Sequence, residues 1–199
     1  MYRKDRQNEF YTRLAKEENY PARSVYKLKE MDEKYHIIKP GDRVLDLGCS
    51  PGSWLLYLSQ RVGDKGQVVG VDIEEVKIPK KTNIVFIKKD ILDLQESDFK
   101  DKFEVVVSDL APKTSGIKSL DSGKSLELAE KSFEIAKSVL VPEGNFVCKI
   151  FEGEENDEFF KRVGDSFAFA KRFKPKAVIK KSKEFYIIAK EYLKTASKK

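Results

Sequence analysis

The fold of this chain is decided by one stretch, Val44-Leu45-Asp46-Leu47-Gly48-Cys49-Ser50-Pro51-Gly52-Ser53-Trp54. It predicts a short buried strand, a tight glycine turn and the start of a helix. Gly48 and Gly52 let the backbone pass close to a ligand, because they carry no side chain. The helix start presents free N–H groups and the positive end of its dipole to the turn. We therefore expect a cofactor site at the carboxyl end of the first strand, with Asp46 as a hydrogen-bonding carboxylate inside that strand.

The composition indicates one domain with a full core, because 199 residues suffice for one. The net charge of +6 favours a polyanionic partner. No apolar run approaches the roughly 20 residues that span a bilayer, and the N-terminus lacks an apolar signal segment. We therefore expect a cytoplasmic protein with no membrane partner. Two cysteines without metal-ligand spacing and one histidine argue against zinc chemistry and a Cys-His nucleophile, so acid–base work must fall to Lys, Asp, Glu or Tyr.

Strand and helix patterns alternate along the chain, which predicts an α/β fold with a mainly parallel sheet and helices on both faces. A basic hairpin joins the last two strands, so the final strand is expected to run antiparallel. We expect residues 1–20 to form a basic arm or helix and residues 21–199 a single domain. The seven expected strands are residues 43–47, 67–71, 84–87, 103–109, 145–151, 167–173 and 184–189.

Three local signals predict element boundaries. Ser24 is expected to cap the helix that follows it. Residues 110–122 are rich in Pro, Ser, Thr and Gly and predict a loop, followed by a helix over residues 123–140. Pro142-Glu143-Gly144 is expected to end that helix.

Acidic residues lie at or just after the ends of three predicted parallel strands, at the rim where ligands of such sheets bind. They are Asp72, Asp90 and Asp109. Asp72 is placed to accept both hydroxyls of an adenosine ribose, and Asp90 the adenine amino group. The glycine turn lacks the third glycine of the dinucleotide pattern, which admits a pyrophosphate. A cofactor without phosphates fits better, and this favours S-adenosylmethionine over NAD.

Several motifs together resemble the FtsJ/RrmJ family of RNA ribose 2′-O-methyltransferases. They are Ser24-Val25-Tyr26-Lys27-Leu28, Asp46 to Trp54, Ser108-Asp109-Leu110-Ala111-Pro112, Val147-Cys148-Lys149-Ile150-Phe151 and Ser182-Lys183-Glu184-Phe185-Tyr186. The resemblance spans residues 20–189 and implies a Rossmann-like methyltransferase fold. It also implies an enzyme that methylates a uridine of large-subunit ribosomal RNA. One departure is Lys113, where a small amide is expected, and it affects local substrate contacts rather than the chemistry.

The resemblance also implies which residues act. It gives a catalytic set of Lys27, Asp109, Lys149 and Glu184, and cofactor contacts from Gly52, Trp54, Asp72, Asp90 and Asp109.

Methyl transfer from a sulfonium needs a positioned 2′-oxygen, about 3–3.5 Å from the methyl carbon, and a group that takes its proton. Lys149 interrupts an apolar strand, and we expect it to be the proton acceptor. Burial and a second cation both lower the pKa of a lysine, and Lys27 would be that cation. Asp109 and Glu184 would orient the two amines.

Basic residues near this rim are expected to hold RNA phosphates. They lie in residues 171–176 and 180–183 and, in the arm, at Arg3, Lys4, Arg6, Arg13, Lys16 and Arg23. We expect a monomer whose partner is RNA, with ribosomal RNA within the large subunit as the first target. Three alternatives remain open: a methyltransferase of the tRNA anticodon loop, a non-catalytic RNA-binding protein, and an NAD-dependent oxidoreductase.

Overall fold

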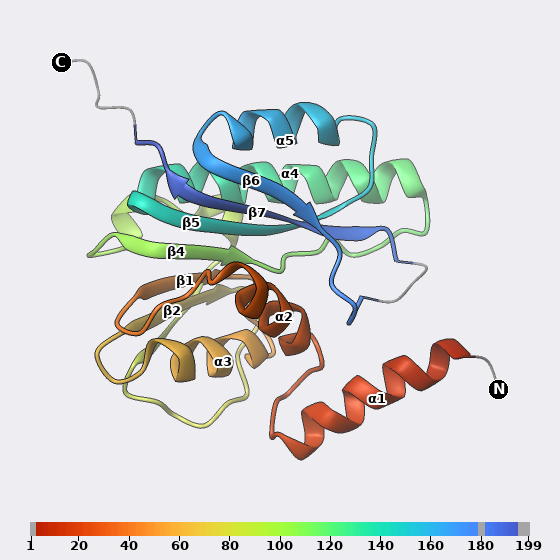
Figure 1. The fold of residues 1–199 in the computed structure, drawn as a ribbon, viewed down its shortest axis with the longest axis horizontal. Coiled ribbons are helices and arrows are strands. Elements are labelled where there is room, and N and C mark those ends of the chain that lie inside the picture. Colours follow the sequence, from red (N-terminus) through yellow and green to blue (C-terminus); the bar gives the residue numbers. More distant parts are fainter. Residues whose placement is uncertain (1–2, 179–181, 195–199) are drawn as a thin grey trace.

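The computed structural model describes residues 3–178 and 182–194 (Figure 1). A seven-stranded sheet in the order β3-β2-β1-β4-β5-β7-β6 forms its centre. The five neighbouring strands β3-β2-β1-β4-β5 pair in parallel. Strand β7 pairs antiparallel with both β5 and β6. The strands are β1 (Arg43–Leu47), β2 (Gln67–Asp72), β3 (Ile84–Lys88), β4 (Phe103–Ser108), β5 (Leu140–Phe151), β6 (Phe167–Phe173) and β7 (Glu184–Tyr192).

Helices cover both faces of the sheet (Figure 1). On one face lie α2 (Val25–Tyr35) and α3 (Ser53–Val62), and on the other lie α4 (Lys118–Val139) and α5 (Asn156–Gly164). Each face encloses its own apolar cluster. Two 3-10 turns, η1 (Ile91–Asp93) and η2 (Glu96–Asp98), connect β3 to β4. None of the helices in the described ranges combines the length and apolar character needed to cross a bilayer.

Helix α1 (Arg3–Glu17) extends away from the sheet (Figure 1). It is joined to the body near its C-terminal end, where Ala15 is buried and Tyr11 lies 5.2 Å, ring centre to ring centre, from Tyr26 of α2. Residues 3–17 of the predicted N-terminal arm form this helix.

The predicted sheet is confirmed, including its antiparallel final strand, because the alternation of apolar strands and helices leaves few other topologies. Parallel strands β1, β2 and β4 end at one rim. Strand β7 begins at that same rim because it runs the other way, and Glu184 pairs there with Phe151. Two residues further along, Tyr186 pairs with Lys149. The antiparallel strand therefore delivers Glu184 and Tyr186 to the edge where the other strands end.

The structure differs from the prediction at the start of α4, at the start of β5 and in the cap of α2. Ser24 stands at the N-cap of α2 as predicted, but its side chain makes no capping bond, because its backbone is already helical (φ −57°, ψ −23°). Helix α4 begins at Lys118 rather than residue 123, since the Asp121 carboxylate accepts the N–H groups of Ser115 and Gly116 and closes the loop early.

Helix α4 ends at Val139, within one residue of the predicted end and before Pro142-Glu143-Gly144, whereas β5 begins at Leu140 rather than at residue 145. Leu140 joins the sheet by pairing with Phe103. The strand register shifts before the next pair, Val105 with Asn145, so the Pro-Glu-Gly segment lies in the irregular part of β5.

Candidate active site

The turn after β1 requires glycine at two positions. Gly48 and Gly52 have φ values of +79° and +108°, which side-chain-bearing residues rarely adopt. A Cβ on Gly48 would lie 2.7 Å from Leu110 Cδ2, and a Cβ on Gly52 would lie 2.5 Å from Ile78 Cγ2. The backbone of the turn is thus closely surrounded, and neither glycine is replaceable without strain.

Helix α3 begins directly after this turn. Its first backbone bond runs from the Leu56 N–H to the Gly52 carbonyl, at 3.1 Å. The amides of Ser53 and Trp54 therefore lack an intrahelical partner and can hold the anionic end of a ligand. The Trp54 side chain has another role, because its indole N–H donates to the Ser24 carbonyl at 2.9 Å. Only the backbone amide of Trp54 is left to serve a cofactor.

Asp46 lies inside β1 and is fully buried, and neither of its carboxylate oxygens has a hydrogen-bond partner. Burial raises its pKa well above the usual value, and the charges of Asp109 and Asp72 raise it further. A buried polar group without a partner calls for an explanation. A ligand with a cationic amino group would complete this site, and the residues present therefore fit S-adenosylmethionine.

Asp72 is the last residue of β2, and Asp90 lies two residues after the end of β3. Asp72 accepts the Ser50 N–H at 2.8 Å and the Glu74 N–H at 2.9 Å, and so ties the glycine turn to β2. Asp90 accepts the Leu92 N–H at 2.9 Å. A carboxylate has about four acceptor positions, so both can accept further bonds from a ribose or an adenine.

Two exposed apolar residues follow these carboxylates, and the sequence analysis did not single them out. They are Ile73, directly after Asp72, and Leu92, two residues after Asp90. Exposed apolar surface beside the predicted ribose and adenine partners suits a flat aromatic base. Only their position after the acidic residues could have indicated them.

The four residues of the predicted catalytic set meet at this rim as two ion pairs. Lys149 Nζ lies 3.0 Å from Asp109 Oδ1 and also donates to the Asp109 backbone carbonyl. Lys27 Nζ lies 2.5 Å from Glu184 Oε1 in a charge contact without a hydrogen bond. Lys149 is buried, with 7% of its side chain exposed. Asp109 thus holds the direction of this enclosed amine, and the Lys27–Glu184 pair lies at the same rim.

Tyr186 connects the two ion pairs. Its hydroxyl donates to Asp109 Oδ1 at 2.7 Å, and Lys27 Nζ lies 5.9 Å from its ring centre. Burial acts to raise the pKa of Asp109, but the charges of Lys149 and Lys27 and this hydroxyl outweigh it, and the pKa is lowered. Asp109 is therefore a charged partner for Lys149 at neutral pH. The sequence analysis missed Tyr186, whose only signal was its place in the last motif.

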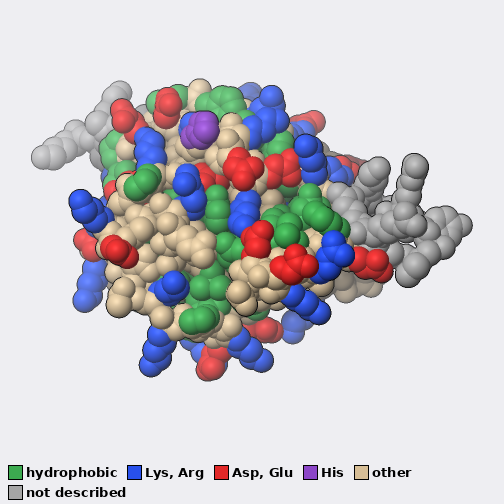
Figure 2. All heavy atoms as spheres, turned by 60° about the horizontal axis from the view of Figure 1, so that its bottom comes forward, with side chains coloured by type: hydrophobic (Ala, Val, Ile, Leu, Met, Phe, Trp, Pro, Cys, Tyr) green, Lys and Arg blue, Asp and Glu red, His purple; other side chains and the backbone are tan. Residues whose placement is uncertain are grey.

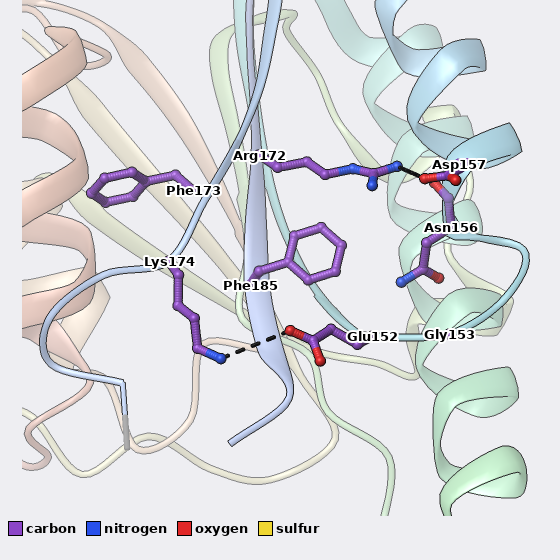
Figure 3. Close-up of a pocket in the computed structure, with 8 residues that line it drawn as sticks. All are labelled: Glu152, Gly153, Asn156, Asp157, Arg172, Phe173, Lys174 and Phe185. Atoms are coloured by element: carbon purple, nitrogen blue, oxygen red, sulfur yellow. Dashed lines mark hydrogen bonds and ion pairs between the residues drawn. The ribbon is translucent and has the colours of Figure 1, made fainter. Parts of the chain in front are cut away.

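The basic run at the end of β6 is partly neutralised within the chain. Arg172 lies 2.6 Å from Asp157 and Lys174 lies 3.9 Å from Glu152. Both pairs line one pocket of about 320 Å³, and Figure 3 shows how their side chains face each other. Lys180 and Lys181, also predicted to hold RNA, lie outside the described residues. Basic and acidic side chains are likewise interspersed over the face in Figure 2. Positive charge is therefore not concentrated in one patch on that face.

The fold and this rim define an S-adenosylmethionine-dependent methyltransferase with a Rossmann-like sheet. The model of the FtsJ-like methyltransferases matches residues 20–192, and the chain belongs to that family.

Two similar curated proteins are each named ribosomal RNA large subunit methyltransferase E. The protein from Desulfatibacillum aliphaticivorans is 48% identical over 182 residues, covering 89% of this chain and 87% of its own. That from Bdellovibrio bacteriovorus is 43% identical over 184 residues, covering 89% and 93%.

Solved structures share the fold. A Plasmodium falciparum protein, provisionally described as a ribosomal RNA methyltransferase, has a TM-score of 0.78 and 25% identity, and the match covers 87% of this chain and 99% of that one. Human methyltransferase-like protein 13, in complex with SAH, has a TM-score of 0.57 and 15% identity, with 79% and 76% covered. The family match excludes the alternative function of an NAD-dependent oxidoreductase, which the sequence analysis left open.

Proposed function

We propose that this protein transfers a methyl group from S-adenosylmethionine to a ribose 2′-hydroxyl of RNA, in a uridine of large-subunit ribosomal RNA. One observation carries the reaction: a buried amine, Lys149, is held by Asp109 at the rim beside the cofactor turn, next to the second ion pair of Lys27 and Glu184. The names of the curated relatives support the ribosomal target.

The bound cofactor supplies an electrophilic methyl group, so the protein needs no nucleophile of its own. Its residues hold the ribose 2′-oxygen in line and remove its proton. Lys149 accepts that proton at Nζ, which requires the amine to be neutral at that moment. Asp109 fixes the direction of Nζ, and Tyr186 fixes Asp109 through its hydroxyl. Lys27, fixed by Glu184, supplies positive charge beside the 2′-oxygen as that atom loses its proton.

The cofactor is held by the glycine turn and the acids around it. The free amides at the start of α3 take its carboxylate, Asp46 its amino group, Asp72 its ribose and Asp90 its adenine. Trp54 contributes its backbone N–H. We assign these roles from burial, free hydrogen-bonding capacity and position along the rim.

The remaining features of the proposal concern RNA and assembly. Residues 21–199 act as a single domain in the cytoplasm, as a monomer, and residues 1–20 add a basic arm, helical over residues 3–17, that helps to hold RNA. The basic residues at the rim bind phosphates without reading sequence. Their binding is therefore expected to weaken as the salt concentration rises.

Lys149→Arg tests the chemistry, because arginine keeps the charge but cannot give up its proton. Turnover should fall by about 10²–10⁴-fold, the usual contribution of a positioned base, while the affinity for S-adenosylmethionine measured by calorimetry stays within threefold. Near-normal turnover would remove Lys149 from this role.

The RNA target is tested by mapping 2′-O-methyl marks after incubation with large ribosomal subunits and, separately, with bulk tRNA. A single modified uridine in large-subunit RNA is expected. A 2′-O-methyl mark confined to the tRNA anticodon loop would show that tRNA, and not ribosomal RNA, is the target. If the protein binds the cofactor but marks neither RNA, it is a non-catalytic RNA-binding protein.

A further inference from the structure

One backbone carbonyl is shared between the cofactor turn and the helix that carries Lys27. The Ser24 carbonyl accepts the indole N–H of Trp54 at 2.9 Å and the backbone N–H of Lys27 at 3.0 Å. Trp54 is the second residue of α3 and is 3% exposed. A single acceptor thus joins the residue after the glycine turn to the residue that forms the second ion pair.

A second bond fastens the same two segments. The Ser53 hydroxyl accepts the Ala22 N–H at 2.6 Å, and Ser53 is buried. Helix α2 has no side-chain cap of its own at Ser24. The start of α2 is therefore fixed by the first turn of α3, and not by a local capping bond.

The other side of the indole braces the catalytic rim. Its ring lies 6.1 Å from the Tyr186 ring, tilted by 34°. Tyr186 in turn bonds Asp109 and lies beneath Lys27. Trp54 thus contacts Ser24 at the start of the Lys27 helix and Tyr186, which bonds Asp109.

We infer that Trp54 is a positioning residue for Lys27: through the Ser24 carbonyl it locks the start of α2, and with it the Lys27 amine, to the cofactor turn. The inference rests on the proposed role of Lys27. Its physical reason is that a displacement of about 1 Å at a reacting group can cost on the order of 10²-fold in rate. The side chain of Trp54 therefore serves the geometry of proton removal, and its backbone amide serves the cofactor.

Trp54→Phe removes the indole donor and keeps an aromatic ring. The Ser24 carbonyl retains the Lys27 N–H, so no buried acceptor is orphaned. We expect single-turnover methyl transfer to fall at least tenfold, with the S-adenosylmethionine Kd from calorimetry unchanged within threefold. Exchange of the Lys27 amide with deuterium, measured without cofactor, should become faster. Ser53→Ala removes the second bond and should change both readouts in the same direction, which provides a test if Trp54→Phe does not fold.

Tyr57→Phe is the matched control. Tyr57 lies on the same helix and donates to Asp32 of α2 at 2.8 Å, so this variant also removes one buried bond between α3 and α2. It should lower the unfolding temperature and leave methyl transfer within twofold.

The decisive comparison is a double-mutant cycle with Lys27→Met. If Trp54 acts through Lys27, then Trp54→Phe changes methyl transfer less than twofold once Lys27 is Met. An equal loss in both backgrounds would overturn the inference and leave a structural role. A collapse of cofactor affinity in Trp54→Phe would instead make the indole part of the cofactor site. The cycle is separate from the Lys149→Arg test, so either proposal can fail while the other stands.

Discussion

Asp46→Asn should stabilise the cofactor-free protein while weakening its hold on S-adenosylmethionine. Asp46 is a buried carboxyl in β1 with no hydrogen-bond partner and with a raised pKa. The substitution keeps the shape of the side chain and removes the charge. Because binding sites retain groups that the free protein would fold better without, stability and affinity should move in opposite directions.

The magnitude depends on pH. The pKa of Asp46 in the folded protein lies above the unfolded value of about 3.9. Between the two values the folded state binds one more proton, so its stability falls by about 1.4 kcal/mol per pH unit as the pH rises. Below about pH 4 the contribution of Asp46 to the free energy of unfolding is fully present. That contribution is lost as the pH rises through the folded pKa of Asp46.

The free energy of unfolding of Asp46→Asn should therefore equal that of the wild type near pH 4. At pH 8 the variant should be more stable than the wild type, by about 1.4 kcal/mol for each pH unit by which the folded pKa of Asp46 exceeds the unfolded one. For a domain of this size each kcal/mol raises the unfolding temperature by about 2–4 °C.

Denaturant unfolding of both proteins from pH 4 to pH 8 measures this difference. Asp32→Asn is the control, because Asp32 is equally buried but accepts bonds from Ile37, Ile38, Tyr57 and Arg61. It should lose about 1.5–3 kcal/mol, since it weakens bonds to a charged group. Calorimetry in buffers of different ionisation enthalpy should show proton release when S-adenosylmethionine binds the wild type, and none with Asp46→Asn. The reasoning fails if Asp46→Asn gains no stability between pH 4 and pH 8, or if its affinity for the cofactor is unchanged.

Three further predictions concern the turn, the rim and the RNA surface. Gly52→Ala forces a Cβ against Ile78 at a φ of +108°. It should cost about 1–3 kcal/mol of stability, measured by thermal unfolding, and at least tenfold in cofactor affinity, measured by calorimetry. An unchanged affinity would show that the turn does not bind the cofactor. Tyr186→Phe removes the hydroxyl that fixes Asp109 and should lower single-turnover methyl transfer about tenfold with cofactor affinity unchanged, whereas full activity would leave Tyr186 a packing residue. Replacing Lys180 and Lys181 with Gln should weaken RNA binding and reduce its salt slope by about 0.7–0.9 per lysine, and an unaltered slope would mean that neither contacts phosphate.

The sequence alone determined the sheet, the glycine turn and the identity of the residues at the rim. Local apolar periodicity predicts the strands and helices. A backbone with positive φ favours glycine, so Gly48 and Gly52 indicate the turn without coordinates. The rule that parallel strands end at one edge then gathers Asp72, Asp90 and Asp109.

Tertiary structure decided which side chains face one another. The pairing of Lys149 with Asp109 and of Lys27 with Glu184, the hydroxyl of Tyr186 between them, and the isolation of Asp46 all depend on elements far apart in the chain. No local pattern records such contacts, because the packing of one element against another sets them.

The same reason explains the element boundaries that were wrong and the role of Trp54 that was missed. Asp121 starts α4 early by accepting amides from the preceding loop, and Leu140 starts β5 early by pairing with Phe103. Trp54 reads in sequence as part of a cofactor motif, whereas its indole reaches across to Ser24 on another segment. A motif identifies which residue is present, and only the packing of α3 against α2 determines what its side chain does.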